Sequence, residues 1–66
     1  MQLTFEIDEI MKVYNIIGNY WVYAIVLDKD VEHLYKVKSL PSNEIGYCEP
    51  RYMVKISNTE RILYGI

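Results

Sequence analysis

The run YWVYAIVL at residues 20–27 constrains this chain most, because it is typical of a β-strand that is apolar on both faces. Successive side chains of a strand point to opposite sides of the sheet. One side then carries Tyr20, Val22, Ala24 and Val26, and the other carries Trp21, Tyr23, Ile25 and Leu27. In a chain of 66 residues the second face needs a cover, either from curvature of the sheet or from another molecule.

The length indicates one small domain, residues 1–66, with a thin core. A chain of this size buries only about 60% of its unfolded surface, and its core contributes roughly 3–5 kcal/mol unless a disulfide, a metal or an oligomer adds to it. The single cysteine, Cys48, excludes an internal disulfide, and no cluster of Cys, His and carboxylates has metal-site spacing. We therefore expect the chain to form a homodimer or to dock on a protein partner.

Composition narrows the class of protein further. No apolar run reaches 18 residues and no basic start precedes an apolar block, so neither a membrane span nor a signal peptide is predicted. A lone free cysteine fits the cytoplasm. The net charge of −2 argues against a general nucleic-acid binder. Rich use of Ile and Tyr with little Gly, Ala, Pro and Arg is typical of AT-rich genomes, including bacteriophages, and suggests a viral protein.

The first segment predicts an amphipathic helix over residues 8–17, with an extension back to Thr4, ended by Gly18 and Asn19. Its stripe has spacings of three and four and consists of Leu3, Ile7, Ile10, Tyr14 and Ile17. The alternative is a short strand at the start, because Leu3, Phe5 and Ile7 alternate with polar residues. The helix is also apolar off its stripe, which is more hydrophobic surface than one contact to a small sheet requires.

The rest of the chain predicts short strands joined by turns. In order we expect a strand at 20–27, a turn at 28–30, a strand at 31–38, a loop at 39–46, a strand at 51–56, a turn at 57–60 and a strand at 61–66. The predicted class is α+β, with an N-terminal helix packed on a small antiparallel meander of three to four strands. The strand and turn rhythm after Gly18 resembles small SH3-like barrels, which implies a version of the sheet curled toward an SH3-like half-barrel.

The register of the first hairpin decides which residues share a face. A three-residue turn pairs odd positions with odd ones and gives one wholly apolar face, made of Trp21, Tyr23, Ile25, Leu27, Val31, His33, Tyr35 and Val37. A two- or four-residue turn pairs odd with even positions and places Lys36 and Lys38 over Tyr23 and Trp21. We expect the first register, because it separates apolar from charged residues more fully.

Catalytic and metal sites find little support in the sequence. Cys48 as a nucleophile with His33 as its base lacks any spacing signature, and a packed thiol and a structural histidine are the plainer interpretations. The acidic run DKDVE lacks the glycine and the distal glutamate of a calcium loop. The three glycines lie far apart, so no phosphate-binding loop is present. We expect a protein that is not an enzyme and that holds no cofactor.

Aromatic residues indicate binding. Seven tyrosines cannot all be buried in so small a core, and Tyr, Trp, Met and Arg are enriched in protein interfaces. The predicted partner-binding residues are Trp21, Tyr23, Tyr47, Arg51, Tyr52 and Met53.

The leading hypothesis is therefore a non-catalytic protein-binding module or inhibitor that occupies a surface of a larger protein, with a host or bacterial-defence protein as the target if the chain is phage-encoded. One alternative is a small nucleic-acid-binding barrel, with phosphate contacts from Lys36, Lys38, Lys55, Arg51 and Arg61. Another is a small-ligand binding protein with a nucleotide site between subunits.

Overall fold

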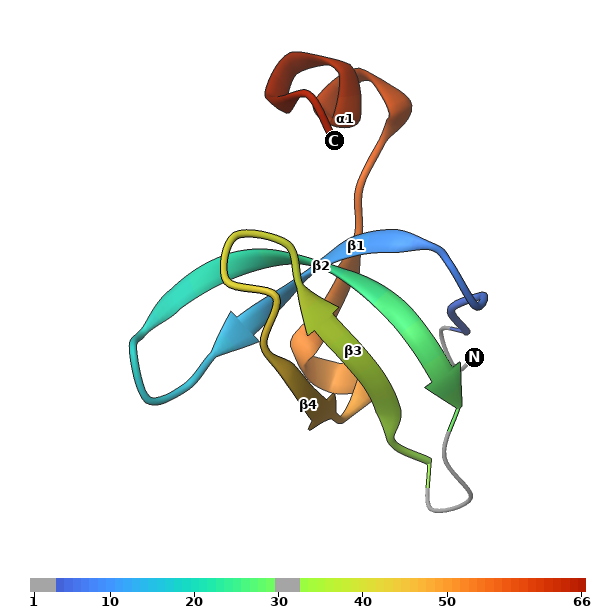
Figure 1. Cartoon of the computed structure of the whole chain (residues 1–66), viewed down its shortest axis with the longest axis vertical. Helices are drawn as coiled ribbons and strands as arrows, with labels where there is room; N and C mark the ends of the chain where they lie inside the picture. Colours follow the sequence, from blue (N-terminus) through green and yellow to red (C-terminus); the bar gives the residue numbers. More distant parts are fainter. Residues whose placement is uncertain (1–3, 30–32) are drawn as a thin grey trace.

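The computed structural model describes residues 4–29 and 33–66, and it shows a curled antiparallel sheet with a short C-terminal helix (Figure 1). The five strands lie in the order β4-β3-β2-β1-β5. Their bounds are Ile10–Asn15 for β1, Tyr20–Lys29 for β2, Tyr35–Ser39 for β3, Ile45–Cys48 for β4 and Met53–Lys55 for β5. A 3-10 helix, η1, spans Pro50–Tyr52, and the helix α1 spans Asn58–Tyr64.

The predicted N-terminal helix is wrong, and with it the predicted class of a helix packed on a meander. The segment forms β1 instead, paired with β2 from Ile10↔Ile25 to Asn15↔Tyr20. Its isoleucines, valine and tyrosine are residues that strands favour and helices do not. Met11, which lay off the helical stripe, is completely buried. In a strand, alternate side chains point to the same face, and Met11 and Val13 both point inward. This explains why these two residues are apolar although they lie off the predicted helical stripe.

The last segment was also predicted wrongly, as a turn and a strand. It forms α1, which begins where the Ser57 side chain accepts a hydrogen bond from the Glu60 N–H at 3.1 Å. It ends at Gly65, whose φ of 71° is the left-handed conformation that glycine adopts at little cost. Serine three residues before glutamate, with a glycine soon after, is a helix signature, and it outweighs the alternation that predicted a strand.

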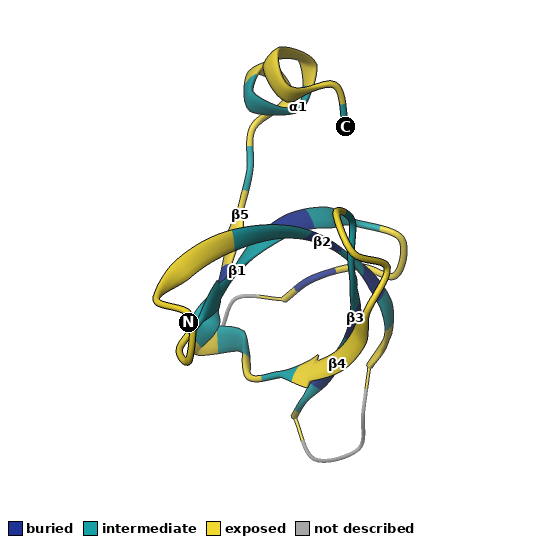
Figure 2. Ribbon diagram, turned by 60° about the vertical axis from the view of Figure 1, so that its left-hand side comes forward, coloured by how far each residue is buried: buried dark blue, intermediate teal, exposed yellow. Residues whose placement is uncertain are grey.

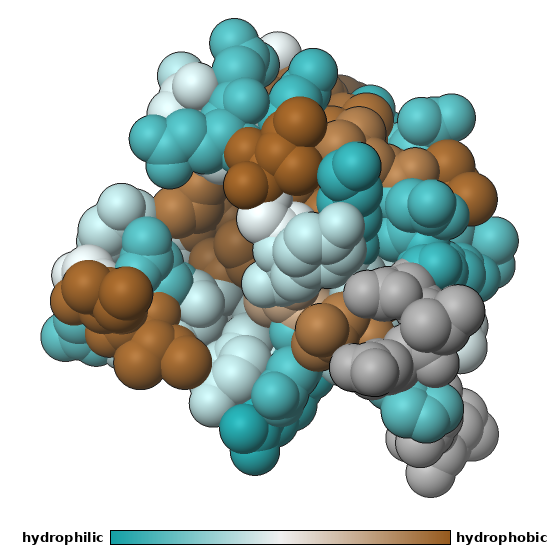
Figure 3. Space-filling model, turned by 60° about the horizontal axis from the view of Figure 1, so that its bottom comes forward, coloured by the Kyte–Doolittle hydropathy of each residue, from teal (hydrophilic) through white to brown (hydrophobic). Residues whose placement is uncertain are grey.

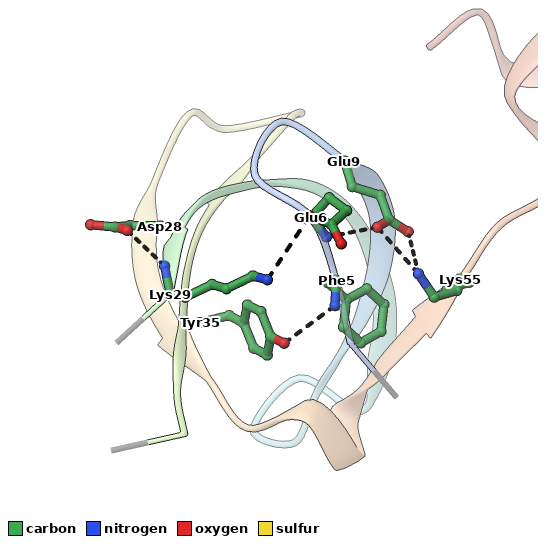
Figure 4. A network of polar contacts seen from close by, with 7 residues as sticks. All are labelled: Phe5, Glu6, Glu9, Asp28, Lys29, Tyr35 and Lys55. Carbon is green, nitrogen blue, oxygen red and sulfur yellow. Dashed lines mark hydrogen bonds and ion pairs between the residues drawn. The ribbon is translucent and has the colours of Figure 1, made fainter. Parts of the chain in front are cut away.

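The interior of the curled sheet holds the core (Figure 2). In the described part of the chain its buried members are Phe5, Met11, Ala24, Val26, Tyr35, Val37 and Met53. Phe5 precedes β1 and lies inside the curl, with its ring edge-on to Tyr35 at 5.6 Å between centroids (Figure 4). The Phe5 N–H donates to the Tyr35 hydroxyl at 3.2 Å. Phe5 and Tyr35 therefore close this end of the curled sheet.

The predicted core face of β2 is wrong, and a bulge explains why. At the outer end of the hairpin, Lys29 pairs with Tyr35, which joins odd to odd positions as expected. The register then shifts at Leu27, so Val26 pairs with Val37 and Ile25 with Lys38. One extra residue in a strand moves the side chains on the far side of the bulge from the hairpin loop to the opposite face. Ala24 and Val26 therefore enter the core, and Trp21 and Tyr23 lie on the outer surface.

The other predicted strands, turns and loops are confirmed only in part. The strand at residues 20–27 is confirmed within β2, and the strand at 51–56 is shorter in β5. The loop at 39–46 is a tighter hairpin that leads into β4, which was not predicted. Part of the turn at 28–30 and of the strand at 31–38 lies outside the described residues. Of the described part of that strand, residues 35–38 belong to β3, whereas His33 and Leu34 are not in a strand.

Candidate protein-binding surface

The turn between β1 and β2, residues 16–19, is held by its own side chains; we call it the hairpin tip. The Asn15 side-chain oxygen accepts from the Gly18 N–H at 2.9 Å, and the Asn15 carbonyl accepts from the Asn19 N–H at 2.7 Å. The Asn15 amide also donates to the Tyr20 hydroxyl at 3.3 Å. Tyr14 donates its hydroxyl hydrogen to the Asn19 side chain. These bonds hold the backbone of the tip in one conformation.

Two backbone positions explain the residues chosen for the tip. Asn19 has a φ of 58°, a left-handed conformation that Asn tolerates better than most residues do. A Cβ placed on Gly18 would lie 2.0 Å from the ring of Tyr20, so only glycine leaves that ring in its position. The sequence GN, which was predicted to end a helix, instead closes a hairpin.

The hairpin tip presents hydrophobic side chains to solvent. Ile17 is 99% exposed and Ile16 59%, and Tyr20 next to them is 53% exposed. Figure 3 shows the hydrophobic residues of one face as separate areas, and one of them projects at the left, where Figure 1 places this turn. No charged residue occurs from Val13 to Leu27. A hydrogen-bonded, uncharged turn with two exposed isoleucines therefore lies at the surface.

The outer face of β1 and β2 continues this surface with aromatic residues. The rings of Trp21 and Tyr14 meet edge-on at 5.2 Å between centroids, and the Lys12 ammonium lies 5.8 Å from the Trp21 ring. Trp21 is 50% exposed. Between this face and α1 lies a groove of about 270 Å³, which we call the helix groove; its lining consists of Lys12, Trp21, Val22, Tyr23 and Tyr64.

A small polar cluster connects α1 to the sheet. The Tyr23 hydroxyl donates to Glu60 at 2.7 Å, and the Lys12 ammonium lies 3.5 Å from the same carboxylate oxygen. The hydrogen bond to Glu60, aided by partial desolvation, raises the pKa of Tyr23 to about 12. The same bond, with the charge of Lys12, lowers the pKa of Glu60 below its usual value. Both shifts favour a neutral Tyr23 bound to an ionised Glu60.

The structure separates the predicted binding residues into distinct places. Trp21 and Tyr23 share the outer face of β2, whereas Tyr47 lies on β4 and is 61% exposed. The other predicted members come from η1 and β5: the Arg51 guanidinium lies 4.9 Å from the Tyr52 ring, and Met53 is only 2% exposed. Met53 is thus a core residue. The hairpin tip is not among the predicted residues, although two adjacent isoleucines before Gly-Asn could have indicated it.

The groups considered for catalysis are not arranged for it. Burial, with the nearby charge of Glu49, raises the pKa of the Cys48 thiol, which disfavours the reactive thiolate. The Cys48 thiol donates to the Glu49 carbonyl at 3.4 Å. His33 is exposed, and no hydrogen bond joins it to Cys48 in the described part of the chain. Within residues 4–29 and 33–66, no group of His, Cys, Asp and Glu is placed to hold a metal ion.

The basic residues considered for phosphate contacts lie on different elements. Lys55 is 3.1 Å from Glu9, and Arg51 is 2.6 Å from Glu49. Arg61 donates to the carbonyl of Ile66 at 3.2 Å. Lys36 and Lys38 lie on β3, opposite Tyr47 and Ile45 of β4. Three of these five cations therefore already have partners within the chain, which does not favour a common phosphate-binding track.

No protein family, curated protein or solved structure matches this chain. The described residues contain no helix that is long and apolar enough to cross a membrane.

Proposed function

We propose that this chain is a non-catalytic protein-binding module that inserts its hairpin tip into an apolar pocket of a larger protein. The observation that carries the proposal is the 99% exposure of Ile17 on a turn whose backbone is fixed by side-chain hydrogen bonds. A large exposed apolar residue costs solubility, and clusters of them mark binding sites. Occupying such a pocket would block it, which is how a small protein without catalytic groups can inhibit.

The energetics of the tip suit this role. Full burial of one isoleucine side chain contributes roughly 1.5–3 kcal/mol, so two of them approach the size of a binding hot spot. Because the turn is already ordered, association loses less conformational entropy than with a flexible loop. Tyr20 and Trp21 flank the tip and belong to the residue types that carry most interface energy. The absence of charge from Val13 to Leu27 means that no ion is desolvated there.

The phage-like residue usage makes a bacterial protein the natural target. The first test immobilises the chain, captures proteins from a bacterial lysate and identifies them by mass spectrometry. The binding of each purified candidate is then measured by calorimetry with the original chain, with Ile17→Asp and with the matched control Thr59→Asp, which lies on exposed α1.

We expect Ile17→Asp to weaken binding roughly 100-fold, because a charge would have to enter an apolar pocket. Thr59→Asp should bind as the original chain does, and the far-ultraviolet circular dichroism of all three proteins should agree. Equal affinity of the Ile17→Asp protein would show that the tip is not the anchor.

A lipid bilayer is the competing apolar environment. Exposed isoleucine, tyrosine and tryptophan also suit a membrane interface. Flotation with vesicles of neutral phosphatidylcholine therefore distinguishes binding to a bilayer from binding to a protein pocket. Under the proposal the chain stays with the soluble fraction. Vesicle binding that disappears in Ile17→Asp would replace the protein pocket by a bilayer.

A further inference from the structure

The end of the curled sheet opposite Phe5 contains a pocket, which we call the mouth pocket. Because the strands are antiparallel, the β1–β2 turn and the β3–β4 loop lie at the same end of the sheet, away from the N-terminal segment (Figure 1). The space between them has a volume of about 260 Å³. Its apolar lining includes Val13, Val22, Ala24 and Val37. The mouth of a curled sheet is a common place for a ligand site.

Strand pairing turns polar residues into this pocket as well. Buried Ala24 pairs with Ser39, and the Ser39 N–H donates to the Glu44 carbonyl at 2.8 Å. Residues directly opposite each other on neighbouring strands share a face of the sheet. Ser39 and Glu44 therefore face the same interior as Ala24, and both line the mouth pocket.

Gly46 keeps one side of the mouth pocket open. It pairs with Val37, which is only 7% exposed, so a side chain at this position would project into the interior. A Cβ on Gly46 would meet no atom within 4 Å. The φ of Gly46 is not positive, so its backbone conformation does not require glycine. The missing side chain therefore leaves space in the pocket rather than relieving strain.

Glu44 gives the mouth pocket its charge. It is the single charged residue among the described residues that line the pocket. In the described part of the chain no ion pair involves its carboxylate. Lys36 and Lys38 alternate with buried Val37 along β3 and so point to the outer face of the sheet. A negative charge beside apolar walls favours a cation and disfavours phosphates and carboxylates.

We propose that the mouth pocket binds an alkylammonium group, with the alkyl chain against the apolar lining and the charged end at Glu44. An ammonium has three N–H donors and accepts nothing, which matches a carboxylate flanked by the hydroxyls of Ser39 and Ser42. The ring of Tyr20, which is 53% exposed, lines the same pocket and offers an aromatic face to a cation. Two sources supply this group, a free aliphatic amine and a lysine side chain of another protein.

The test is a nuclear magnetic resonance titration of the ¹⁵N-labelled chain with three compounds of equal length: pentylammonium, pentanol and pentanoate. These probes share the alkyl chain and differ in the charge of the end group. We expect pentylammonium to move the amide signals of Ser39 and Gly46 with a Kd of roughly 1 mM, as suits so small a ligand. Pentanol and pentanoate should bind at least about 10-fold more weakly.

Two variants locate the site. Glu44→Gln should weaken pentylammonium binding roughly 10-fold, because it removes the charge and keeps the shape. The matched control is Glu6→Gln, which removes the same charge from a side chain that is 78% exposed at the closed end, and it should bind like the original chain. Gly46→Val should abolish binding, since it fills the open side of the pocket. Near-ultraviolet circular dichroism checks that each variant keeps its core.

Three results would overturn the proposal. They are pentanol or pentanoate binding as tightly as pentylammonium, unchanged binding to a folded Glu44→Gln protein, and signal changes that leave Ser39 and Gly46 unaffected. Nα-acetyl-lysine amide distinguishes the sources: tighter binding than pentylammonium assigns the pocket to a protein lysine, and weaker binding assigns it to a free amine. Ile17 does not line the pocket, so Ile17→Ala should bind pentylammonium unchanged even if the hairpin tip has no protein target.

Discussion

Phe5 and Ile17 show how differently the two ends of the β1–β2 hairpin treat a large apolar side chain. Phe5 is completely buried, and its backbone N–H is bonded to the Tyr35 hydroxyl. Ile17 is 99% exposed at the other end, on a turn in which the Gly18 and Asn19 N–H groups donate to Asn15. One end of the curled sheet is closed by its own chain and the other end presents hydrophobic residues. Under the proposed function, stability and binding depend on opposite ends of the sheet.

The largest effect should come from removing the side chain that closes the sheet. Phe5→Ala should lower the free energy of unfolding by about 3–5 kcal/mol, because a buried aromatic ring leaves a cavity. In a domain of this size such a loss approaches the whole stability. Urea unfolding followed by circular dichroism measures it. Ile17→Ala is the matched control and should stay within about 0.5 kcal/mol of the original chain; similar losses for both substitutions would erase the contrast between the ends.

A smaller effect should follow from the loss of one oxygen at the closed end. Tyr35→Phe keeps the ring beside Phe5 but leaves the buried Phe5 N–H without its acceptor at 3.2 Å. An unpaired buried donor costs roughly 1–3 kcal/mol. Tyr47→Phe removes the same atom from a residue that is 61% exposed and should change the unfolding free energy little. If the two variants unfold at the same urea concentration, the hydroxyl of Tyr35 does not stabilise this end.

The smallest effect concerns the charges around the closed end, which Figure 4 shows as Glu6 and Glu9 with Lys29 and Lys55. Burial raises the pKa of Glu9, but hydrogen bonds from the Glu6 N–H and from Lys55 outweigh it and lower that pKa below 4.5. This stabilisation is therefore present above pH 4.5 and is lost as the pH falls through the folded-state pKa.

Urea unfolding at neutral and at acidic pH tests this linkage. The original chain should lose slightly more stability on acidification than Glu9→Gln does, by less than about 1 kcal/mol, because the pair is near the surface. Identical pH dependence of the two proteins would show that Glu9 is not the group that responds.

Local pattern predicted some elements and not others. The apolar run of residues 20–27 forms a strand whichever of its faces is buried, because its residues favour strands and no helix-forming stretch competes. The segment with Met11 and Val13 fits both the helical period of about 3.6 residues and the strand period of two. Spacing alone therefore did not decide between a helix and a strand. The capping residues Ser57 and Gly65 are enough to predict α1, but the alternation in residues 61–66 predicted a strand instead.

The sequence alone determined that this small chain has more apolar and aromatic surface than its core can take, and that strands joined by turns make up most of it. Only the tertiary structure decided which residues carry that surface. The bulge at Leu27 turned Trp21 and Tyr23 outward, since one extra residue reverses the side chains that lie beyond the bulge from the hairpin loop. Pairing of β1 with β2 buried Met11 and left Ile17 in solvent. These outcomes depend on contacts between segments, which local spacing does not encode.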